Sequence, residues 1–226
     1  MRKFLAVLLI LLLVPVACVI VATYSHADLH ALPQLESGDL IFETTNTSQT
    51  PAILFATHSL YTHVGIIHKH ASGFTVVQAM RHVTETSLAD FILSGWGEQF
   101  TILRYPGLSD DEREAIVRNA ESYIGRGYNF VFYMPAREIY CSELPFFSFQ
   151  SAHKPIGTVQ KIGDLHVNNP EVHKLFEARW HMHPACQKPG MDYDTCWKAV
   201  LAEPIITPVS LARDPKLTQI YSNYLF

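Results

Sequence analysis

Three polar side chains have the types that thiol catalysis needs: Cys141, His63 and Gln78. A thiol becomes a nucleophile when a neighbouring imidazole takes its proton and a third polar group orients that imidazole. Cys141 lies where an extended aromatic run gives way to an expected helix start, and the unpaired N–H groups of a helix N-terminus favour the thiolate. The sequence therefore indicates Cys141 as nucleophile, His63 as base and Gln78 as orienting amide. The plainer interpretation is a small core cysteine and a hydrogen-bonded strand histidine.

A hairpin is expected to bring the histidine and the amide together. Tyr61–His68 has the composition of a strand, Lys69–Gly73 supplies a turn, and Phe74–Met80 forms the returning strand. On one face of an antiparallel pair, facing Cβ atoms lie about 4.5–5.5 Å apart. We therefore expect His63 and Gln78 to be neighbours on this hairpin.

The remaining pattern predicts an α+β fold in which an antiparallel sheet packs on helices. Ser109 and Glu112 have the spacing of a capping box, and Gly125 and Gly127 end the helix that follows. The region 128–133 is aromatic and extended. Strands are expected at 40–42, 98–105 and 205–211, the last running into a helical turn, helices at 52–60, 88–93, 110–124 and 172–181, and a surface loop at 43–51.

The composition is typical of one folded domain. The 226 residues are 48% apolar and 17% charged, with a formal net charge of −4. Such a chain can bury a core, and it has no run of Lys or Arg with which to bind phosphate groups. Nucleic acid is therefore not an expected partner. The pattern predicts no particular oligomeric state.

The N-terminal segment carries a signal for export. Arg2 and Lys3 precede an apolar run from Phe4 to about Thr23, broken only by Pro15. This run approaches the ~20 residues of a membrane-spanning helix. Because the basic end stays in the cytoplasm, the rest of the chain is expected to be extracytoplasmic, in the periplasm or cell envelope.

Three fates of this segment remain open. Residues 4–23 could stay as an anchor in the inner membrane, small residues at 25 and 27 allow cleavage before Asp28, and a lipid could be attached at Cys18. In each case residues 1–27 are a signal peptide or N-terminal membrane anchor. Residues 28–226 are the expected catalytic domain, with a core at 37–149 and a C-terminal elaboration at 150–226.

A second pair of cysteines agrees with an oxidising compartment. Cys186 and Cys196 lie ten positions apart in a loop containing Pro and Gly, and a disulfide that closes this loop is favoured. The alternative is a metal site in which His181 and His183 join the cysteines, although the spacing matches no closed structural zinc pattern. The favoured interpretation involves no metal and no cofactor.

Three motifs follow one another in a distinctive order. They are His63–Gly65 on a strand, the run Gly125–Phe130 (GRGYNF) and the run Tyr140–Leu144 (YCSEL), with a weaker echo at Ile206–Ala212. This order resembles the permuted papain-like amidases of the YaeF/YiiX type, which belong to the wider NlpC-like superfamily of cysteine hydrolases. The similarity spans about Ser37–Phe149 and implies a permuted papain-like (NlpC-like) fold.

By this resemblance Cys141 matches the nucleophile, His63 the general base and Gln78 the third position. The chain departs from the family at the third position, where relatives carry a glutamate in a Glu-Ala pair and this chain has Gln78-Ala79. A carboxylate would raise the imidazolium pKa, whereas an amide only orients the ring, as in papain-like enzymes. Glu85 is a candidate substitute acid, although its position after the strand argues against it.

The expected chemistry is hydrolysis of an amide or ester bond through an acyl-enzyme on Cys141. The Cys141 N–H and the Tyr61 hydroxyl would stabilise the oxyanion. Small peptides, cell-wall amides and lipid-like acyl substrates all fit, with the membrane as a partner through the N-terminal segment. One alternative is a membrane-tethered binding module without turnover, suggested by Gln78 and the aromatic segment 146–149. Another is metal-dependent hydrolysis through the histidines of the Cys186 loop.

Overall fold

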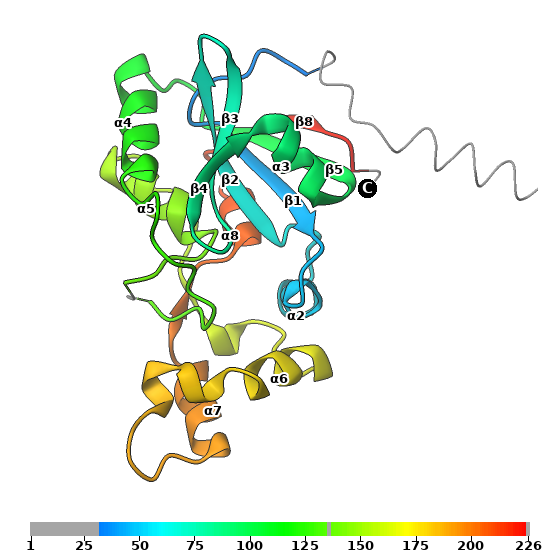
Figure 1. Cartoon of the computed structure of the whole chain (residues 1–226), viewed down its shortest axis with the longest axis vertical. Helices are drawn as coiled ribbons and strands as arrows, with labels where there is room; N and C mark the ends of the chain where they lie inside the picture. The colour runs from blue at the N-terminus through cyan, green and yellow to red at the C-terminus, as the bar shows by residue number, and fades with distance from the viewer. Residues whose placement is uncertain (1–31, 135–136, 225–226) are drawn as a thin grey trace, which may run out of the picture.

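The computed structural model describes residues 32–134 and 137–224. Its centre is a six-stranded antiparallel sheet in the order β4-β3-β2-β1-β5-β8 (Figure 1). The first described strand, β1, is therefore central, and the last joins the edge beside β5. The strands are β1 Leu40–Thr45, β2 His63–His70, β3 Gly73–Ala79, β4 Val83–Ser87, β5 Gly95–Arg104 and β8 Thr218–Ser222.

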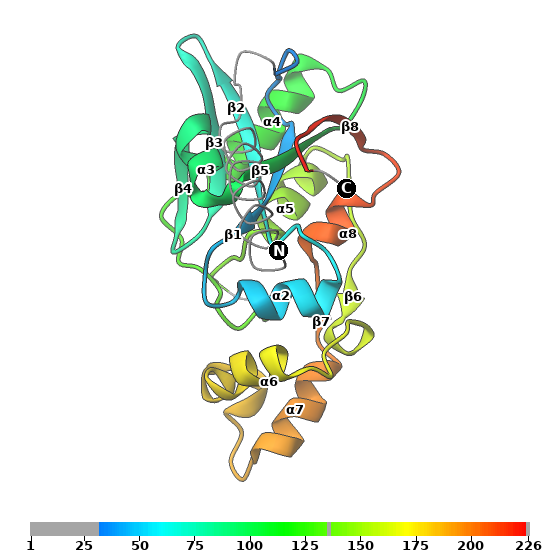
Figure 2. The ribbon, with the colours of Figure 1, turned by 90° about the vertical axis from the view of Figure 1, so that its right-hand side faces the viewer.

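Helices cover both faces of this sheet (Figure 2). Side chains of α4 and α5 pack in one apolar cluster, which defines the α4/α5 face, and side chains of α3 pack in a second cluster on the opposite α3 face. Ser109 and Glu112 form the expected capping box at the start of α4. The helices of this part are α2 Thr50–Thr57, α3 Leu88–Ser94, α4 Asp110–Glu121, α5 Glu143–Ser151 and α8 Pro208–Ala212.

Alternation along β2 decides which side chains reach which face. Val64 and Ile66 pack in the cluster of the α4/α5 face, and Ile67 packs with Phe91 on the α3 face. Gly65 faces α3, and a Cβ there would collide with the side chain of Val76 and lie 3.2 Å from the ring of Phe91. The strand that carries His63 is therefore closely packed on both sides.

A small lobe is formed by the segment between α5 and α8 and lies at one end of the molecule (Figure 1). Its core contains Cys186 and Cys196, which form a disulfide. The lobe contacts α2: the His166 N–H donates to the Ala56 carbonyl at 2.9 Å, and the rings of His166 and His58 stack. Its elements are α6 Pro170–Glu177, α7 Tyr193–Leu201, the 3-10 turns Ile162–Asp164, Trp180–Met182 and Pro184–Cys186, and the short strands β6 Gln160–Lys161 and β7 Pro204–Ile205.

The sequence pattern does not predict β4 or β8. β4 reads VTETS and is mostly polar, so its pairing with β3 rather than its own alternation makes it a strand. β8 pairs with β5, so the central sheet includes a strand from beyond residue 149. β1 continues through Thr45, into the segment expected to be a surface loop. The aromatic run that begins at Tyr128 forms no strand, and its β-pairing is a single bridge between Tyr128 and Ile139.

The expected N-terminal hydrophobic helix, with its anchor, cleavage and lipid-attachment alternatives, falls in residues 1–31, outside the described residues. Among the helices of residues 32–134 and 137–224, none has both the length and the apolar character needed to cross a membrane.

Candidate active site

Cys141 immediately precedes Ser142, the N-cap of α5, and only 3% of its surface is exposed. Two hydrogen bonds tie this turn to Ile206: Ser142 Oγ donates to the Ile206 carbonyl at 3.0 Å, and the Ile206 N–H donates to the Tyr140 hydroxyl at 3.0 Å. The Glu143 carboxylate also accepts the Tyr140 N–H at 3.0 Å. The cysteine turn is therefore held in place by a segment far along the chain.

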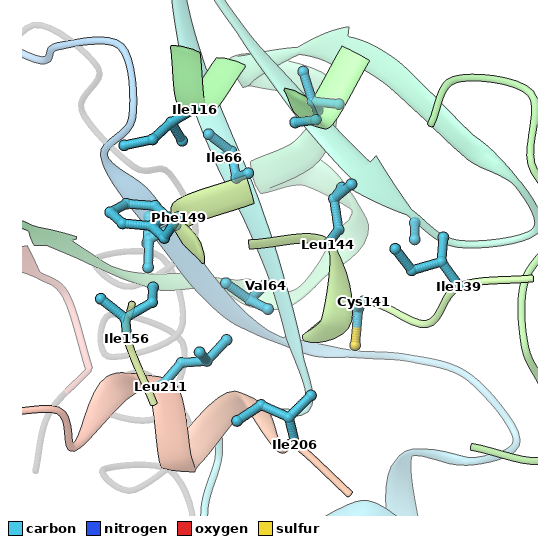
Figure 3. Packing of buried hydrophobic residues seen from close by; sticks show 14 of the residues in the cluster. Val64, Ile66, Ile116, Ile139, Cys141, Leu144, Phe149, Ile156, Ile206 and Leu211 are labelled. Carbon is cyan, nitrogen blue, oxygen red and sulfur yellow. The ribbon is translucent and has the colours of Figure 1, made fainter. Parts of the chain in front are cut away.

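The Cys141 sulfur lies against the backbone on either side of His63. It is 3.9 Å from the Thr62 carbonyl oxygen and also interacts with the Val64 N–H, and the Tyr128 hydroxyl donates to it at 3.9 Å. Figure 3 shows Cys141 among the buried side chains of this cluster, Val64 included. The fold thus brings the cysteine turn to the first residue of β2.

His63 is held by the amide that the sequence indicated. Its Nε2 lies 2.8 Å from Gln78 Oε1, while Gln78 Nε2 donates to Thr86 Oγ1 at 2.9 Å. The imidazole also stacks on Phe91, with ring centroids 5.6 Å apart. Because an amide oxygen only accepts, Nε2 carries the proton and Nδ1 keeps its lone pair. Nδ1 is also the nitrogen nearer the His63 backbone, where the sulfur lies.

The register places His63 and Gln78 as diagonal neighbours, since the direct partner of Gln78 is Gly65. Both side chains belong to the α3 face, whereas Cys141 packs on the α4/α5 face. The thiol and the imidazole therefore lie on opposite faces of the sheet at the end of β2. Within the described residues no hydrogen bond joins them.

Burial sets the protonation states of both groups. It raises the pKa of the Cys141 thiol to about 11, against the lowering effect of the Tyr128 hydroxyl and of Ser142. It lowers the pKa of His63 to about 4, and the Gln78 hydrogen bond offsets only part of this. The thiol and imidazole are therefore both neutral at pH 7. Burial thus opposes the thiolate that a helix N-terminus would favour.

A chain of polar groups from the small lobe ends at the sulfur. Arg179 Nη1 donates to Gln49 Oε1 at 3.1 Å, and Gln49 Nε2 donates to the Tyr128 hydroxyl at 3.2 Å. Because that hydroxyl accepts from Gln49, its own proton is directed towards Cys141. The sequence motif Gly-Tyr-Asn-Phe contains Tyr128, but spacing alone did not single this residue out.

The hydroxyl of Tyr61, expected at the oxyanion, points elsewhere. It donates to Thr101 Oγ1 on β5 at 2.9 Å, and its ring packs against Phe42 and Tyr224. Of Tyr61 and Tyr128, Tyr128 is the one whose hydroxyl contacts the Cys141 sulfur.

Glu43 is a second polar residue that the sequence analysis missed. It is fully buried on β1, directly opposite His63, with Ser94 Oγ donating to Oε1 at 3.3 Å. Its Oε2 has no hydrogen-bond partner in the described part of the chain. Burial raises the pKa of Glu43 to about 9, with Ser94 lowering it slightly, so this carboxyl is neutral at pH 7. The sequence feature that could have identified it is an acidic residue directly after the apolar start of a strand.

An apolar cavity of about 130 Å³ adjoins the cysteine. Cys141 lies in its wall together with Ala52 and Ala56 of α2, Phe132 of the aromatic run and Phe176 of α6. A cavity of about 150 Å³ with such a lining holds a benzene ring, so this one holds an aliphatic segment of several carbons. The space lies between α2 and the small lobe.

Of the remaining candidate residues, His183 lines the cavity beside Cys141, and Glu85 and the cysteine pair have partners of their own. Glu85 interacts with His68 and His70, not with His63. The disulfide between Cys186 and Cys196 removes both thiolates from the metal site considered as its alternative. The other aromatic candidates, 146–149, are helical residues of α5 and contribute to the core.

Comparisons with known proteins identify the family of the chain. A family model described as permuted papain-like amidase enzyme, YaeF/YiiX, C92 family, matches residues 34–221. The uncharacterized protein YiiX of Escherichia coli (strain K12) is 26% identical over 193 residues, covering 84% of this chain and 88% of YiiX.

A solved structure shares the fold. The crystal structure of the metalloprotein YiiX from Escherichia coli O157:H7 superposes with a TM-score of 0.74 at 27% identity, covering 85% of this chain and 99% of that one. Together with the family match over residues 34–221, this shows that the chain belongs to the permuted papain-like amidase family of the YaeF/YiiX type.

Proposed function

We propose that this protein is an extracytoplasmic cysteine hydrolase that cleaves an amide or ester bond of an acyl substrate through an acyl-enzyme on Cys141. The observation that carries this proposal is the position of the cysteine. Its sulfur lies at the N-terminus of α5 and in the wall of an apolar cavity. It also contacts the backbone next to His63, the first residue of β2. The apolar N-terminal run and the Cys186–Cys196 disulfide support export.

The reaction begins from two neutral groups. His63 Nδ1 accepts the thiol proton as the sulfur attacks the carbonyl carbon, so charge develops only as the new C–S bond forms. The tetrahedral intermediate collapses when the imidazolium returns that proton to the leaving amine or alcohol. Water, deprotonated by the same imidazole, then attacks the thioester; the C–S bond breaks, the acid is released, and the imidazolium returns the proton to the Cys141 sulfur. Gln78 holds the ring in the tautomer that each step requires.

The oxyanion requires hydrogen-bond donors near the sulfur. The backbone N–H of Cys141 and the Tyr128 hydroxyl are the groups we assign to this role, Tyr128 replacing Tyr61. Losing one such donor typically costs about 3–4 kcal/mol of transition-state stabilisation.

The cavity favours lipid or other acyl substrates over cell-wall peptides. A peptide would bring polar amide groups into the space between Ala56 and Phe176, where each unpaired group costs about 1–3 kcal/mol. An acyl chain there gains about 0.8 kcal/mol for each buried CH₂ group. The carbonyl at the head of such a chain would lie next to Cys141.

Turnover of a panel of acyl esters, acyl amides and cell-wall peptides tests the proposal. We expect hydrolysis of acyl substrates by the wild type and none by Cys141→Ala. Lys188→Ala, an exposed change in the small lobe, is the control and should keep the wild-type turnover. Equal turnover by the wild type and Cys141→Ala would contradict the proposal.

A membrane-tethered binding module without turnover is the second candidate. It is favoured by the raised thiol pKa and by the lack, within the described residues, of a hydrogen bond between Cys141 and His63. This candidate predicts that a fatty amide binds the wild type and Cys141→Ala with equal affinity and is never cleaved. The same panel therefore distinguishes the two functions.

The description of the YiiX structure as a metalloprotein suggests that this chain also holds a metal. The described residues fit such a group, since they include three imidazole and carboxylate donors that lie within 4.8 Å of one another. Because these donors belong to the far half of β2 and to β4, we assign the metal a structural part and no step of the reaction.

A further inference from the structure

A cluster of imidazoles and carboxylates lies at the end of β2 opposite the cysteine. His68 Nδ1 and His70 Nε2 are each 3.0 Å from Glu85 Oε1, and His68 Nδ1 is 3.5 Å from Glu121 Oε1. All four side chains are partly buried, with exposures between 15% and 35%. Three separate elements, β2, β4 and α4, contribute to one small volume.

The sheet register explains why these side chains meet. His68 and His70 share the α4/α5 face with Ile66, two and four residues earlier on β2. Glu85 on β4 is opposite Val77 of β3, which packs on the same face. Glu121 is the last residue of α4, the helix that covers this end of the face. The convergence is therefore a property of the fold, not of one flexible loop.

The polar groups of this cluster are crowded around one carboxylate oxygen. Glu85 Oε1 is approached by His68, by His70 and by the Thr75 hydroxyl at 2.5 Å. His70 Nε2 also lies 2.9 Å from Thr75 Oγ1. The two imidazoles lie close to each other as well, with ring centroids 3.8 Å apart. A cation bound here would take one nitrogen lone pair from each ring and one oxygen lone pair from Glu85.

The donor set matches zinc. Two imidazole nitrogens and one carboxylate oxygen are ligands that Zn²⁺ accepts at about 2.0–2.2 Å in a tetrahedral site, which places neighbouring ligand atoms roughly 3.3–3.5 Å apart. The separation of 3.0 Å between each imidazole nitrogen and Glu85 Oε1 lies within a few tenths of an ångström of this, and all three donors lie within 4.8 Å of one another. Calcium and magnesium prefer all-oxygen sites, so imidazoles favour a transition metal.

We propose that His68, His70 and Glu85 form a zinc site that joins strands β2 and β4, with Glu121 of α4 at its edge. The site is separate from the proposed catalysis, because His68 is five residues along β2 from His63, about 16 Å at strand spacing. Zinc here acts on the stability of the fold and contacts neither the thiol nor its base.

The test uses the full, untagged chain, stripped of metal by a chelator and then titrated with ZnCl₂. We expect one zinc ion per chain, a higher Tm with zinc, and X-ray absorption showing nitrogen and oxygen neighbours at about 2.0–2.2 Å without sulfur. His70→Ala changes the most exposed of the three ligands, so the variant should fold, and it should weaken zinc binding at least about tenfold.

His181→Ala is the matched control, since His181 is an exposed histidine of the small lobe. Its zinc affinity and its zinc-dependent Tm shift should equal those of the wild type. Three outcomes would overturn the proposal: no zinc bound, equal affinity in His70→Ala and the wild type, or a sulfur neighbour to the metal. The last would point to Cys141. None of these results depends on whether Cys141 hydrolyses a substrate.

Discussion

Glu43 and His63 face each other directly across strands β1 and β2, so a buried carboxyl group lies beside the imidazole of the proposed base. Burial raises the pKa of Glu43 to about 9 and lowers that of His63 to about 4. Both are neutral at pH 7. An ionised carboxylate at this position would favour the imidazolium, which cannot accept a proton. A neutral Glu43 therefore places no negative charge on the strand opposite the proposed base.

Glu43→Gln should stabilise the protein, and increasingly so as the pH rises. The folded-state pKa of about 9 exceeds the ordinary value of 4.5, so the folded state binds more protons between these values and loses stability as pH rises through that window. Glutamine removes this loss, on the order of 3 kcal/mol at pH 7. The measurement is Tm of the variant minus Tm of the wild type from pH 6.5 to 9.

That range lies above the ordinary pKa of His63, 6.5, so titration of His63 does not contribute. The exposed Glu138→Gln serves as control and should show a small, constant difference. A Glu43→Gln difference that does not change with pH would show that Glu43 is ionised in the folded protein.

Gln78 should fix the orientation of the His63 ring and should not make the ring an imidazolium. Gln78→Ala frees the ring to rotate and should lower kcat by about 10²-fold. Gln78→Glu places a carboxylate against Nε2, which raises the His63 pKa and moves the acid limb of the kcat/KM profile to higher pH. Thr86→Val, which removes only the partner of the Gln78 amide nitrogen, should have a smaller effect. An unchanged rate in Gln78→Ala would contradict the orienting role.

Tyr128→Phe should lower kcat by about 10²–10³-fold with little change in KM, because the hydroxyl acts on charge that develops in the transition state. Tyr61→Phe is the matched comparison, since its hydroxyl donates to Thr101. Its kcat should remain within a few-fold of the wild type, and Tm reports any loss of packing. Equal losses in the two variants would remove Tyr128 from the oxyanion site.

Ala56→Trp should fill part of the cavity beside Cys141 and so discriminate against long acyl chains. We expect kcat/KM to fall for long-chain esters and to change little for an acetyl ester. Phe55→Trp, on the same helix but 52% exposed, should leave the chain-length profile unchanged. A uniform loss across all chain lengths in Ala56→Trp would indicate damage to the fold instead of a chain-binding role.

The parts of the fold that depend on residues close together in the sequence were predictable from it. The hairpin of His63 and Gln78 follows from two β-rich runs and one turn, and the capping box of α4 from Ser109 and Glu112. β8 was not predictable, because its polar residues become a strand only beside β5.

In the site, too, some features follow from the sequence alone and others depend on long-range packing. The types and order of Cys141, His63 and Gln78 are visible in the chain, but their surroundings depend on long-range packing. Tyr61 is adjacent to the strand of His63, yet the fold turns its hydroxyl to Thr101. Tyr128 reaches the sulfur because Gln49 and the small lobe hold it there. Burial, which sets both pKa values at the site, also requires the assembled fold.

The measurement that tests the account most directly is the mass of the protein during turnover of an acyl ester. Rapid acid quenching should reveal a species heavier by one acyl group, with the added mass on the Cys141 peptide, in the wild type but not in Cys141→Ala. His63→Ala should form this species about 10²–10⁴-fold more slowly. Turnover without any acyl adduct on Cys141, or an adduct formed equally fast in His63→Ala, would contradict the account.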